Sequence, residues 1–229
     1  MDILYILGNG SVHDNMEIRL SLRTVEKYAK NLDRVFIVGD CPSWIQNVVH
    51  IPQEDRYYFA QNHYLKVYTA CQSDISDNFL LMNDDFYMTK QFNVERYPYY
   101  VRGPLVRNKQ ANHLYKKVIN KTYDYLVNLG YKDPLNYSVH SPIIYNKQNI
   151  IDMKEIAESV LHKTVGYSIR NLYGNFFVKH GIEVHDPKMH EDSEELIQTQ
   201  TGCISSSDKC DKLLKTLDKM FHVKSKYEK

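Results

Sequence analysis

The most restrictive feature of the sequence is a set of short, unbroken apolar runs that are separated by longer segments with helical periodicity. The clearest runs are Ile3–Leu7, Arg34–Asp40 with a turn at its end, and Phe79–Met82. Runs of this length without polar alternation are typical of strands that are buried on both faces. Such strands occur in parallel sheets, whose crossover helices cover both faces. The pattern therefore predicts an α/β fold with a mostly parallel sheet flanked by helices.

Helices are expected between and after these strands. Asp14 and Glu17 have the spacing of a capping box, which predicts a helix that begins near Asp14. A second helix is expected over about Phe59–Cys71, and a further strand at Val48–Ile51. Helical patterns also cover about 110–129, 151–162 and 208–222, and the last is amphipathic and followed by a basic tail that we expect to fray. We expect one domain over residues 1–200, followed by the C-terminal helix and tail over 201–229.

The composition excludes few classes of partner. The net charge of the 229 residues is +1, so a polyanionic partner is neither required nor excluded. The four Cys residues form no CxxC motif, and no apolar run reaches the ~18 residues of a membrane span. The first residues lack the basic region of a signal peptide. We expect a cytoplasmic protein (in the host cytoplasm if the chain is viral) without a membrane span, and its oligomeric state is left open.

Two polar segments directly follow predicted strands. Gly8-Asn9-Gly10 follows the first strand, and Asn83-Asp84-Asp85 follows Phe79–Met82. Ligands of open parallel sheets bind at the carboxyl ends of strands. This coincidence is the first indication of a functional site.

Two adjacent carboxylates at the end of an apolar strand resist joint ionisation. A hard divalent cation removes that cost, because Mg²⁺ or Mn²⁺ binds one or two carboxylates together with phosphate oxygens and waters. Asp84 and Asp85, with Asn83 beside them, therefore suit a metal–diphosphate site. The alternative interpretation is an acidic turn in which Asn83 and the Asp residues cap the next element.

The remaining candidates are weaker when each is taken alone. The small residues Gly8, Asn9 and Gly10 would let a nucleotide approach the backbone, although such loops are more often plain turns. Arg19 and Arg23 lie four residues apart on a helix and could pair with a diphosphate or with carboxylates.

Histidines offer two further possibilities. His140 could act as a general acid or base, although a lone His is more often structural. The segments His185-Asp186 and His190-Glu191-Asp192 could add a metal ligand, but their spacing is not that of a zinc site.

Taken in order, several of these segments resemble the Stealth family of capsular polysaccharide sugar-1-phosphate transferases. The most specific block is Asp14–Tyr28, and the acidic block Phe79–Phe86 also matches the family pattern. Further segments that resemble the family are Arg34–Asp40, Pro42–Trp44, Asn62 within its helix, and, more loosely, His140–Pro142 and Ser168–Asn171. The resemblance runs from about Leu4 to Gly181.

The resemblance implies a GT-A-like fold of Rossmann-like type, a UDP-sugar donor and a divalent metal, Mn²⁺ or Mg²⁺. It also lends phosphate or donor contacts to Arg19, Arg23, Asn62 and Arg170, and a place near the chemistry to His140. The candidate site combines metal ligands Asp84 and Asp85, catalytic side chains Asp85, His140 and Arg170, and donor-binding residues Gly8, Asn9, Gly10, Asn15, Arg19, Arg23, Asn62, Lys66 and Asn83.

The chain departs from the family in three ways. Leu7-Gly8-Asn9-Gly10 lacks the Trp and Asp of the family's opening block, the segment before Asp14 is shorter, and the chain is smaller than typical members. Three hypotheses follow. The first is a metal-dependent glycosyltransferase whose acceptor is a saccharide or a hydroxylated or glucosylated base of viral DNA. The second is a sugar-1-phosphate transferase that releases UMP. The third is a non-catalytic module that binds nucleotide sugars or glycans.

Overall fold

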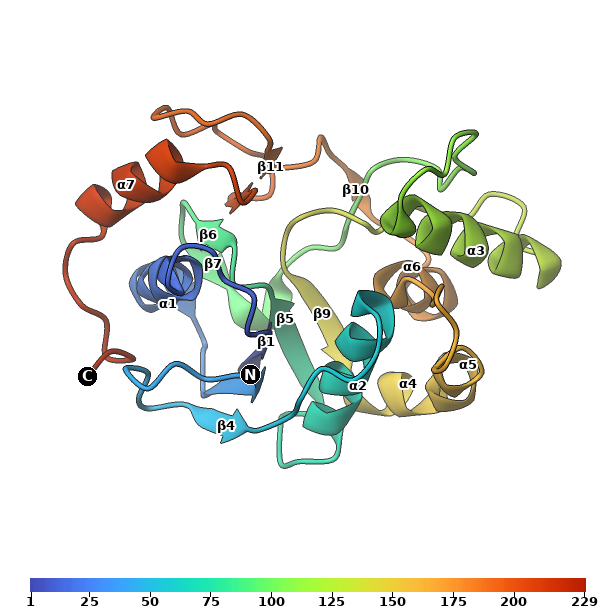
Figure 1. Cartoon of the computed structure of the whole chain (residues 1–229), viewed down its shortest axis with the longest axis horizontal. Coiled ribbons are helices and arrows are strands. Elements are labelled where there is room, and N and C mark those ends of the chain that lie inside the picture. The colour runs from blue at the N-terminus through green and yellow to red at the C-terminus, as the bar shows by residue number, and fades with distance from the viewer.

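The computed structural model describes residues 1–229 and is built around a five-stranded sheet (Figure 1). The strand order is β4-β3-β1-β5-β9. The strands are β1 (Asp2–Leu7), β3 (Val35–Gly39), β4 (Val49–Ile51), β5 (Asn78–Met82) and β9 (Ile143–Asn146). All neighbours pair in parallel except β9, which is antiparallel to β5. The predicted α/β fold with a mostly parallel sheet is confirmed.

The first two helices cover opposite faces of this sheet. The chain passes from β1 through α1 (Met16–Tyr28) to β3 on one side, and later from β4 through α2 (Phe59–Cys71) to β5 on the other side of β1. Right-handed crossovers that run in opposite directions place their helices on opposite faces. Ile3 therefore packs with the apolar residues of α1, whereas Leu4 packs with those of α2. Burial on both faces is the physical reason for the unbroken apolar runs.

The strand order creates a switch point between β1 and β5. The chain leaves the carboxyl end of β1 toward β3 and leaves that of β5 in the other direction, so the two connections diverge and open a crevice. The register pairs Tyr5 of β1 with Met82 of β5. The loops that begin at Gly8 and Asn83 therefore start at the same edge of the sheet.

The remaining helices lie mostly on the α2 side (Figure 1). They are α3 (Leu114–Asn128), α4 (Lys147–Asp152), α5 (Lys154–Glu158), α6 (Ile169–Tyr173) and the π-helical turn η2 (Gly174–Val178). The helix expected at 110–129 thus begins four residues later. The one expected at 151–162 consists of two short helices that start earlier, because the side chain of Asn146 accepts a hydrogen bond from the amide of Asn149 and caps α4.

Short strands connect the outer segments. β6 (Phe86–Met88) pairs antiparallel with β12 (Cys203–Ser206), which pairs in parallel with β11 (Lys188–Met189). Two-residue pairs join β2 (Ala29–Lys30) to β7 (Phe92–Asn93), and β8 (Tyr100–Val101) to β10 (Ile182–Glu183), and η1 (Val94–Arg96) is a 3-10 turn. These pairings bring residues 182–206 back to the segment that follows β5.

Two local expectations are wrong. α1 begins at Met16, and Asp14 does not cap it, because Asp14 adopts the left-handed region (φ 52°) and no side chain caps the helix. The hydroxyl of Ser11 stabilises this start instead: it accepts from the amide of Asn15 at 2.9 Å and donates to Glu17 at 2.9 Å.

The C-terminal tail does not fray either. α7 (Asp211–Met220) packs against α1, and the tail then runs along the α1 side of the molecule to end near the β3–β4 connection (Figure 1). Tyr227 and Glu228 are buried, and the amide of Lys229 donates to the carbonyl of Trp44 at 2.9 Å. No helix combines the length and the apolar character that crossing a membrane requires.

Candidate functional site

The centre of the candidate site is the turn Asn83-Asp84-Asp85 between β5 and β6. β5 is buried between β1 and β9, and the amide of Phe86 donates to the carbonyl of Asn83 at 3.2 Å to close the turn. All three side chains are half-buried at the switch point. The turn therefore holds two carboxylates and an amide at the edge of the sheet where ligands of this architecture bind.

The electrostatics of this turn favour a bound cation. Burial, the charge of Asp85 and the charge of Glu17 raise the pKa of the Asp84 carboxyl to about 7. The side-chain oxygen of Asn83 is buried without a hydrogen-bond partner. A cation would stabilise the ionised form of Asp84 and would give both groups a partner.

Asp85 already has a cationic neighbour. Its Oδ2 atom accepts from Nζ of Lys188 at 2.7 Å and from Oγ of Ser205 at 2.5 Å. Both partners come from the β11–β12 pair, which the antiparallel pairing of β12 with β6 brings to the turn. The other carboxylate oxygen, Oδ1, makes no hydrogen bond.

These donors fit Mg²⁺ or Mn²⁺ but not a metal that needs a complete protein cage. No group of three or more His, Cys, Asp or Glu side chains is arranged to hold a metal. A hard cation that takes one or two carboxylates, with phosphate oxygens and waters in its other positions, needs no such group. Asp84, Oδ1 of Asp85 and the unpartnered oxygen of Asn83 supply oxygen donors of the required kind.

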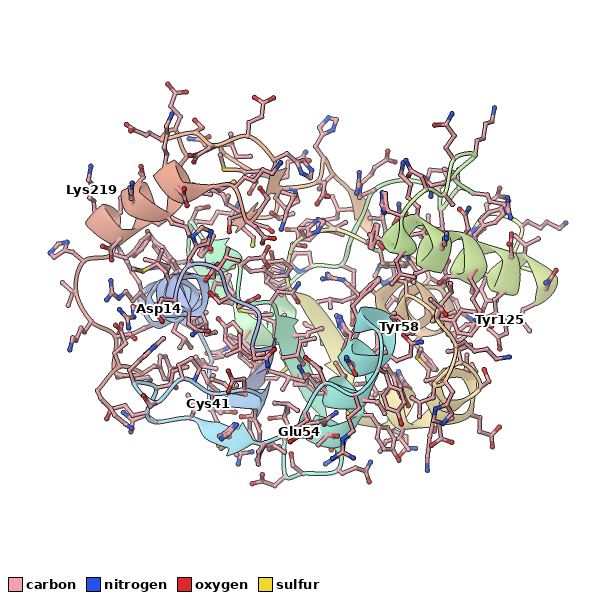
Figure 2. The ribbon with its side chains drawn as sticks, in the orientation of Figure 1. Asp14, Cys41, Glu54, Tyr58, Tyr125 and Lys219 are labelled. Atoms are coloured by element: carbon pink, nitrogen blue, oxygen red, sulfur yellow. The ribbon has the colours of Figure 1, made fainter.

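A cavity of about 140 Å³ lies directly beside the turn. Phe59 of α2 and Tyr115 of α3 form part of its wall, with their ring centroids 6.4 Å apart. Figure 2 shows Tyr58 at the start of α2, one residue before Phe59. The other lining residues are Ala60, His63, Asn83, Phe86, Val118, Ser138, Val139, His140, Tyr167, Ser168, Ile169 and Arg170. An aromatic wall with a few polar groups is typical of a small-molecule site.

The cavity contains unpartnered polar atoms. Nε2 of His63 and Nε of Arg170 are buried without hydrogen-bond partners, while Nη2 of Arg170 donates to the carbonyl of Ser141 at 2.5 Å. Burial, followed by the charges of Arg170 and Lys66, lowers the pKa of His63 to about 3, so His63 is neutral. Buried polar atoms without a partner are rare in folded proteins, so these two atoms are open to hydrogen bonds from a ligand or from water.

Two predicted site residues, His140 and Arg170, thus lie in the same cavity as Asn83. His140 precedes β9 and Arg170 lies in α6. His140 also contacts Asp186 through its Nδ1 atom, at 2.8 Å. The tertiary fold thus brings both side chains into one cavity with Asn83, the residue that precedes Asp84 and Asp85 in the turn.

The glycine loop lies at the same edge but imposes no special conformation. Neither Gly8 nor Gly10 has a positive φ, and a Cβ atom at Gly10 would meet nothing within 4 Å. A Cβ at Gly8 would lie 3.4 Å from Asp55, and Asn9 is exposed. The open space beside Gly10 leaves room for a ligand to approach the backbone.

Arg23 does not lie free at the donor site, and this corrects its assignment. Its Nε and Nη2 atoms donate to the two oxygens of Glu228 at 2.8 and 2.9 Å, and its Nη1 atom donates to Asp218 and to the carbonyl of Phe221. The sequence left open whether Arg23 pairs with a diphosphate or with carboxylates, and in the structure it pairs with carboxylates. Arg23 therefore anchors the C-terminal segment.

Arg19 and Asn15 lie on the same helix. Arg19 stacks on Trp44, with its guanidinium carbon 4.4 Å from the ring centroid, and its Nε atom is 3.6 Å from Glu228. Asn15 adopts the left-handed region at the start of α1, and its side chain caps nothing. Arg19 is 30% exposed, so it keeps access to solvent.

Asn62 and Lys66, which were predicted to bind the donor, both make hydrogen bonds within the protein, and their donor contacts stay a prediction. The Asn62 amide bonds the backbone of Arg56 and Tyr57 and so holds the loop before α2. Nζ of Lys66 donates to the carbonyl of Leu7 at 2.9 Å and pairs with Asp55 at 2.8 Å. Asn62 thus holds the loop before α2, and Lys66 joins the end of β1 to the loop that carries Asp55.

Sequence reasoning did not identify Lys188, Asp186, Ser205 or His63 as site residues. Lys188 contacts Asp85 across 103 positions of the chain, and Asp186 contacts His140 across 46. The only local signal in the sequence is the His185-Asp186 segment, which suggests a metal ligand. Its actual contact is with a histidine.

Comparison with solved structures identifies the fold. An active-site mutant of LgtC superposes with a TM-score of 0.54 over 99% of this chain and 98% of that chain, at 10% identity. The chain has a GT-A-like fold. Galactosyltransferase LgtC in complex with donor and acceptor sugar analogues matches with a TM-score of 0.45 at 10% identity, covering 77% of this chain and 70% of that one. The glycosyltransferase GlyE of Streptococcus pneumoniae matches with a TM-score of 0.41 at 11% identity, covering 81% and 45%.

At such identities the similarity concerns the fold alone. No protein-family model matches the chain, and no curated protein matches it. The GT-A-like architecture expected from the sequence is thus established, whereas the resemblance to the Stealth family remains a resemblance of sequence segments.

Proposed function

We propose that this GT-A-like protein is a glycosyltransferase that uses a nucleotide sugar, with a UDP-sugar as the donor. One observation carries the proposal: the acidic turn Asn83-Asp84-Asp85 lies at the switch point of the sheet, directly beside a cavity of about 140 Å³. The buried cation Arg170 and the histidine His140 line the same cavity.

The proposal gives each part of the donor a region of the site. The nucleoside would lie along the open loop Gly8-Asn9-Gly10, and the diphosphate would lie at Asp84 and Asp85. Mn²⁺ or Mg²⁺ held by these two carboxylates would neutralise charge on the departing diphosphate. Arg170, whose Nε atom has no partner, would contribute positive charge on the cavity side.

Lys188 adds a second positive charge at the site. In the free protein its ammonium lies 2.7 Å from Asp85, where it offsets part of the repulsion between the two carboxylates. A diphosphate at the turn would come within the field of Lys188 as well as of the metal.

The proposal is tested by incubating the protein with a panel of nucleotide sugars in Mn²⁺ or in EDTA and measuring the nucleotide released. We expect metal-stimulated turnover that falls about 10²-fold or more in Asp84→Asn and Asp85→Asn. The matched control is Asp77→Asn, the same change at the exposed start of the β5 segment. Full turnover in both site variants would contradict the metal assignment.

The released nucleotide also separates the alternatives. UDP indicates transfer of the sugar alone, whereas UMP indicates the sugar-1-phosphate transfer that the Stealth resemblance implies. Tight donor binding without turnover for any donor would favour a non-catalytic binding module.

The acceptor is either a saccharide or a hydroxylated base of DNA. One observation favours a polyanion: residues 107–121, which include the start of α3 at the cavity, carry five Lys or Arg and no Asp or Glu. Arg107 pairs with Asp124 at 3.0 Å, whereas Lys109 and Lys117 are exposed. Tyr115 of this segment is exposed, and its ring centroid lies 6.4 Å from that of the exposed Phe59 of α2. Basic and aromatic side chains together are typical of nucleic-acid surfaces.

A further inference from the structure

His140 is held on one side by a buried carboxylate. Nδ1 of His140 lies 2.8 and 3.0 Å from the two carboxylate oxygens of Asp186, and the backbone amide of His140 donates to the same group at 2.9 Å. The side chain of Asp186 is 12% exposed, and Nη1 of Arg102 lies 3.1 Å from it. Three contacts on one carboxylate fix both the backbone and the ring of His140.

This geometry determines which ring nitrogen carries the proton. Burial alone would raise the pKa of the Asp186 carboxyl, but the hydrogen bonds and charge of His140, together with the charge of Arg102, lower it below its usual value. An ionised Asp186 accepts hydrogen bonds only, so Nδ1 of neutral His140 must be the donor. The lone pair is then on Nε2, which makes no hydrogen bond within the chain, and His140 lines the cavity.

The other histidine of the cavity cannot take the same role. His63 has no carboxylate partner, and its charged neighbours are the cations Arg170 and Lys66. A proton accepted by His63 would therefore be repelled in a buried site. Of the two histidines, only His140 has a neighbour that stabilises the imidazolium.

We propose that Asp186 is a positioning residue that holds His140 with Nδ1 protonated, so that Nε2 removes the proton from the acceptor hydroxyl. This inference rests on the proposed transferase function and names the general base of that reaction. The O–H bond of the acceptor breaks and its proton passes to Nε2, while the acceptor oxygen forms the bond to the transferred group. The bond between that group and the departing phosphate breaks with its electron pair on the phosphate oxygen. Asp186 stabilises the imidazolium until the half-exposed ring returns the proton to solvent.

The fold explains how Asp186 reaches this position. Asp186 follows β10, and Arg102 follows β8, and these two strands pair in parallel. The pairing sets Asp186 and Arg102 beside each other, next to the loop that carries His140. No local sequence pattern encodes this contact.

The first test measures the tautomer directly. In protein with ¹⁵N-labelled histidine, two-bond ¹H–¹⁵N spectra distinguish a protonated Nδ1 from a protonated Nε2, and His140→Gln identifies the signals. We expect His140 to be protonated at Nδ1 in the wild-type protein and to lose this preference in Asp186→Asn. Glu183→Gln removes the same charge from an exposed residue of β10 and should leave the His140 signals unchanged.

The second test measures the proton transfer. We expect Asp186→Asn and His140→Gln each to lower kcat for transfer to an alcohol acceptor about 10²-fold, with little change in the KM for the donor. Azide needs no deprotonation, so with azide as the acceptor the loss should fall to less than about 3-fold. Asp186→Glu, which keeps the carboxylate, should recover part of the activity with alcohols.

The outcomes separate this inference from the proposed function. Equal losses with alcohol and azide would show that Asp186 supports the structure rather than the proton transfer, and would overturn the inference. The inference would also be overturned if His140 of the wild-type protein is protonated at Nε2, whether or not a sugar donor has been found. A wild-type protein that transfers nothing from any nucleotide sugar would instead overturn the function, while the tautomer measurement still decides the role of Asp186.

Discussion

At the scale of single residues, the acidic turn carries unfavourable electrostatics that a bound cation would relieve. The carboxyl of Asp84 is buried beside Asp85 and Glu17, and the side-chain oxygen of Asn83 has no partner. Such groups lower the stability of the free protein. Such groups are expected at positions where ligand binding, rather than folding stability, determines which residue is present.

Replacing Asp84 should therefore stabilise the free protein. The folded pKa of about 7 lies above the ordinary 3.8, so ionising Asp84 disfavours the fold increasingly as the pH rises from about 4 to about 7. In EDTA at pH 8, we expect Asp84→Asn to be more stable than the wild type by up to about 4 kcal/mol in urea unfolding. The difference should vanish near pH 4.

Asp77→Asn is the control, since Asp77 is exposed at the other end of β5 and should show no such trend. Added Mn²⁺ should narrow the gap at pH 8, because the cation stabilises only the protein that binds it. If Asp84→Asn is less stable than the wild type at pH 8, the folded protein must already stabilise the ionised carboxylate of Asp84.

At the scale of elements, a buried ion pair helps to hold the C-terminal segment on α1. Arg23 and Glu228 have side chains that are 8% and 4% exposed, and the Arg23 fork donates to both oxygens of Glu228. Burial raises the pKa of Glu228, but the hydrogen bonds from Arg23 and Ser225 outweigh it and lower the pKa. At pH values above the ordinary pKa of Glu, the ion pair contributes its full stabilisation. This stabilisation is lost as the pH falls through the lowered pKa of Glu228.

Arg23→Ala should lower the free energy of unfolding by about 3 kcal/mol, because it leaves the buried carboxylate of Glu228 without its partner. The measurement is urea unfolding at pH 7, repeated at pH 3, where the loss should be smaller. Arg56→Ala is the control: its pair with Glu54 is exposed and 3.7 Å long, and it should change stability by less than about 0.5 kcal/mol. Equal effects of the two variants would show that the tail is not clamped through Arg23.

At the scale of the whole molecule, a net charge of +1 conceals an uneven distribution. The basic residues of 107–121 lie in the loop before α3 and in the first half of α3, and Tyr115 and Val118 of the same segment line the cavity. The overall charge therefore says nothing about a polyanionic acceptor, whereas the local charge favours one.

If the acceptor is DNA, the protein should bind a single-stranded oligonucleotide with an affinity that falls steeply with salt. The combined change of Lys109, Lys116 and Lys117 to Gln should weaken binding and flatten the salt dependence by about 0.7 per lysine. Changing Lys212, Lys215 and Lys219 of α7 to Gln is the matched control and should have little effect. Binding to an acidic polysaccharide but not to DNA would assign the saccharide acceptor instead.

The elements themselves were largely predictable, because strands buried on both faces require unbroken apolar runs. Phe59–Cys71 was predicted with the observed bounds, and Phe79–Met82 differs from β5 by one residue. The capping of α1 was mispredicted, since Ser11 takes the role expected of Asp14. The frayed tail was mispredicted as well, because a basic composition does not reveal that Glu228 reaches a buried arginine.

The sequence alone determined the layered α/β plan and the position of Asp84 and Asp85 at a strand end, since both depend on local periodicity and chain order. Only the tertiary structure decided which side chains share the cavity. Lys188 meets Asp85 and Asp186 meets His140 through pairings of short strands that carry no hydrophobic period of their own. It also decided that Arg23 faces Glu228 rather than a ligand, because which neighbour neutralises a charge depends on how distant segments pack.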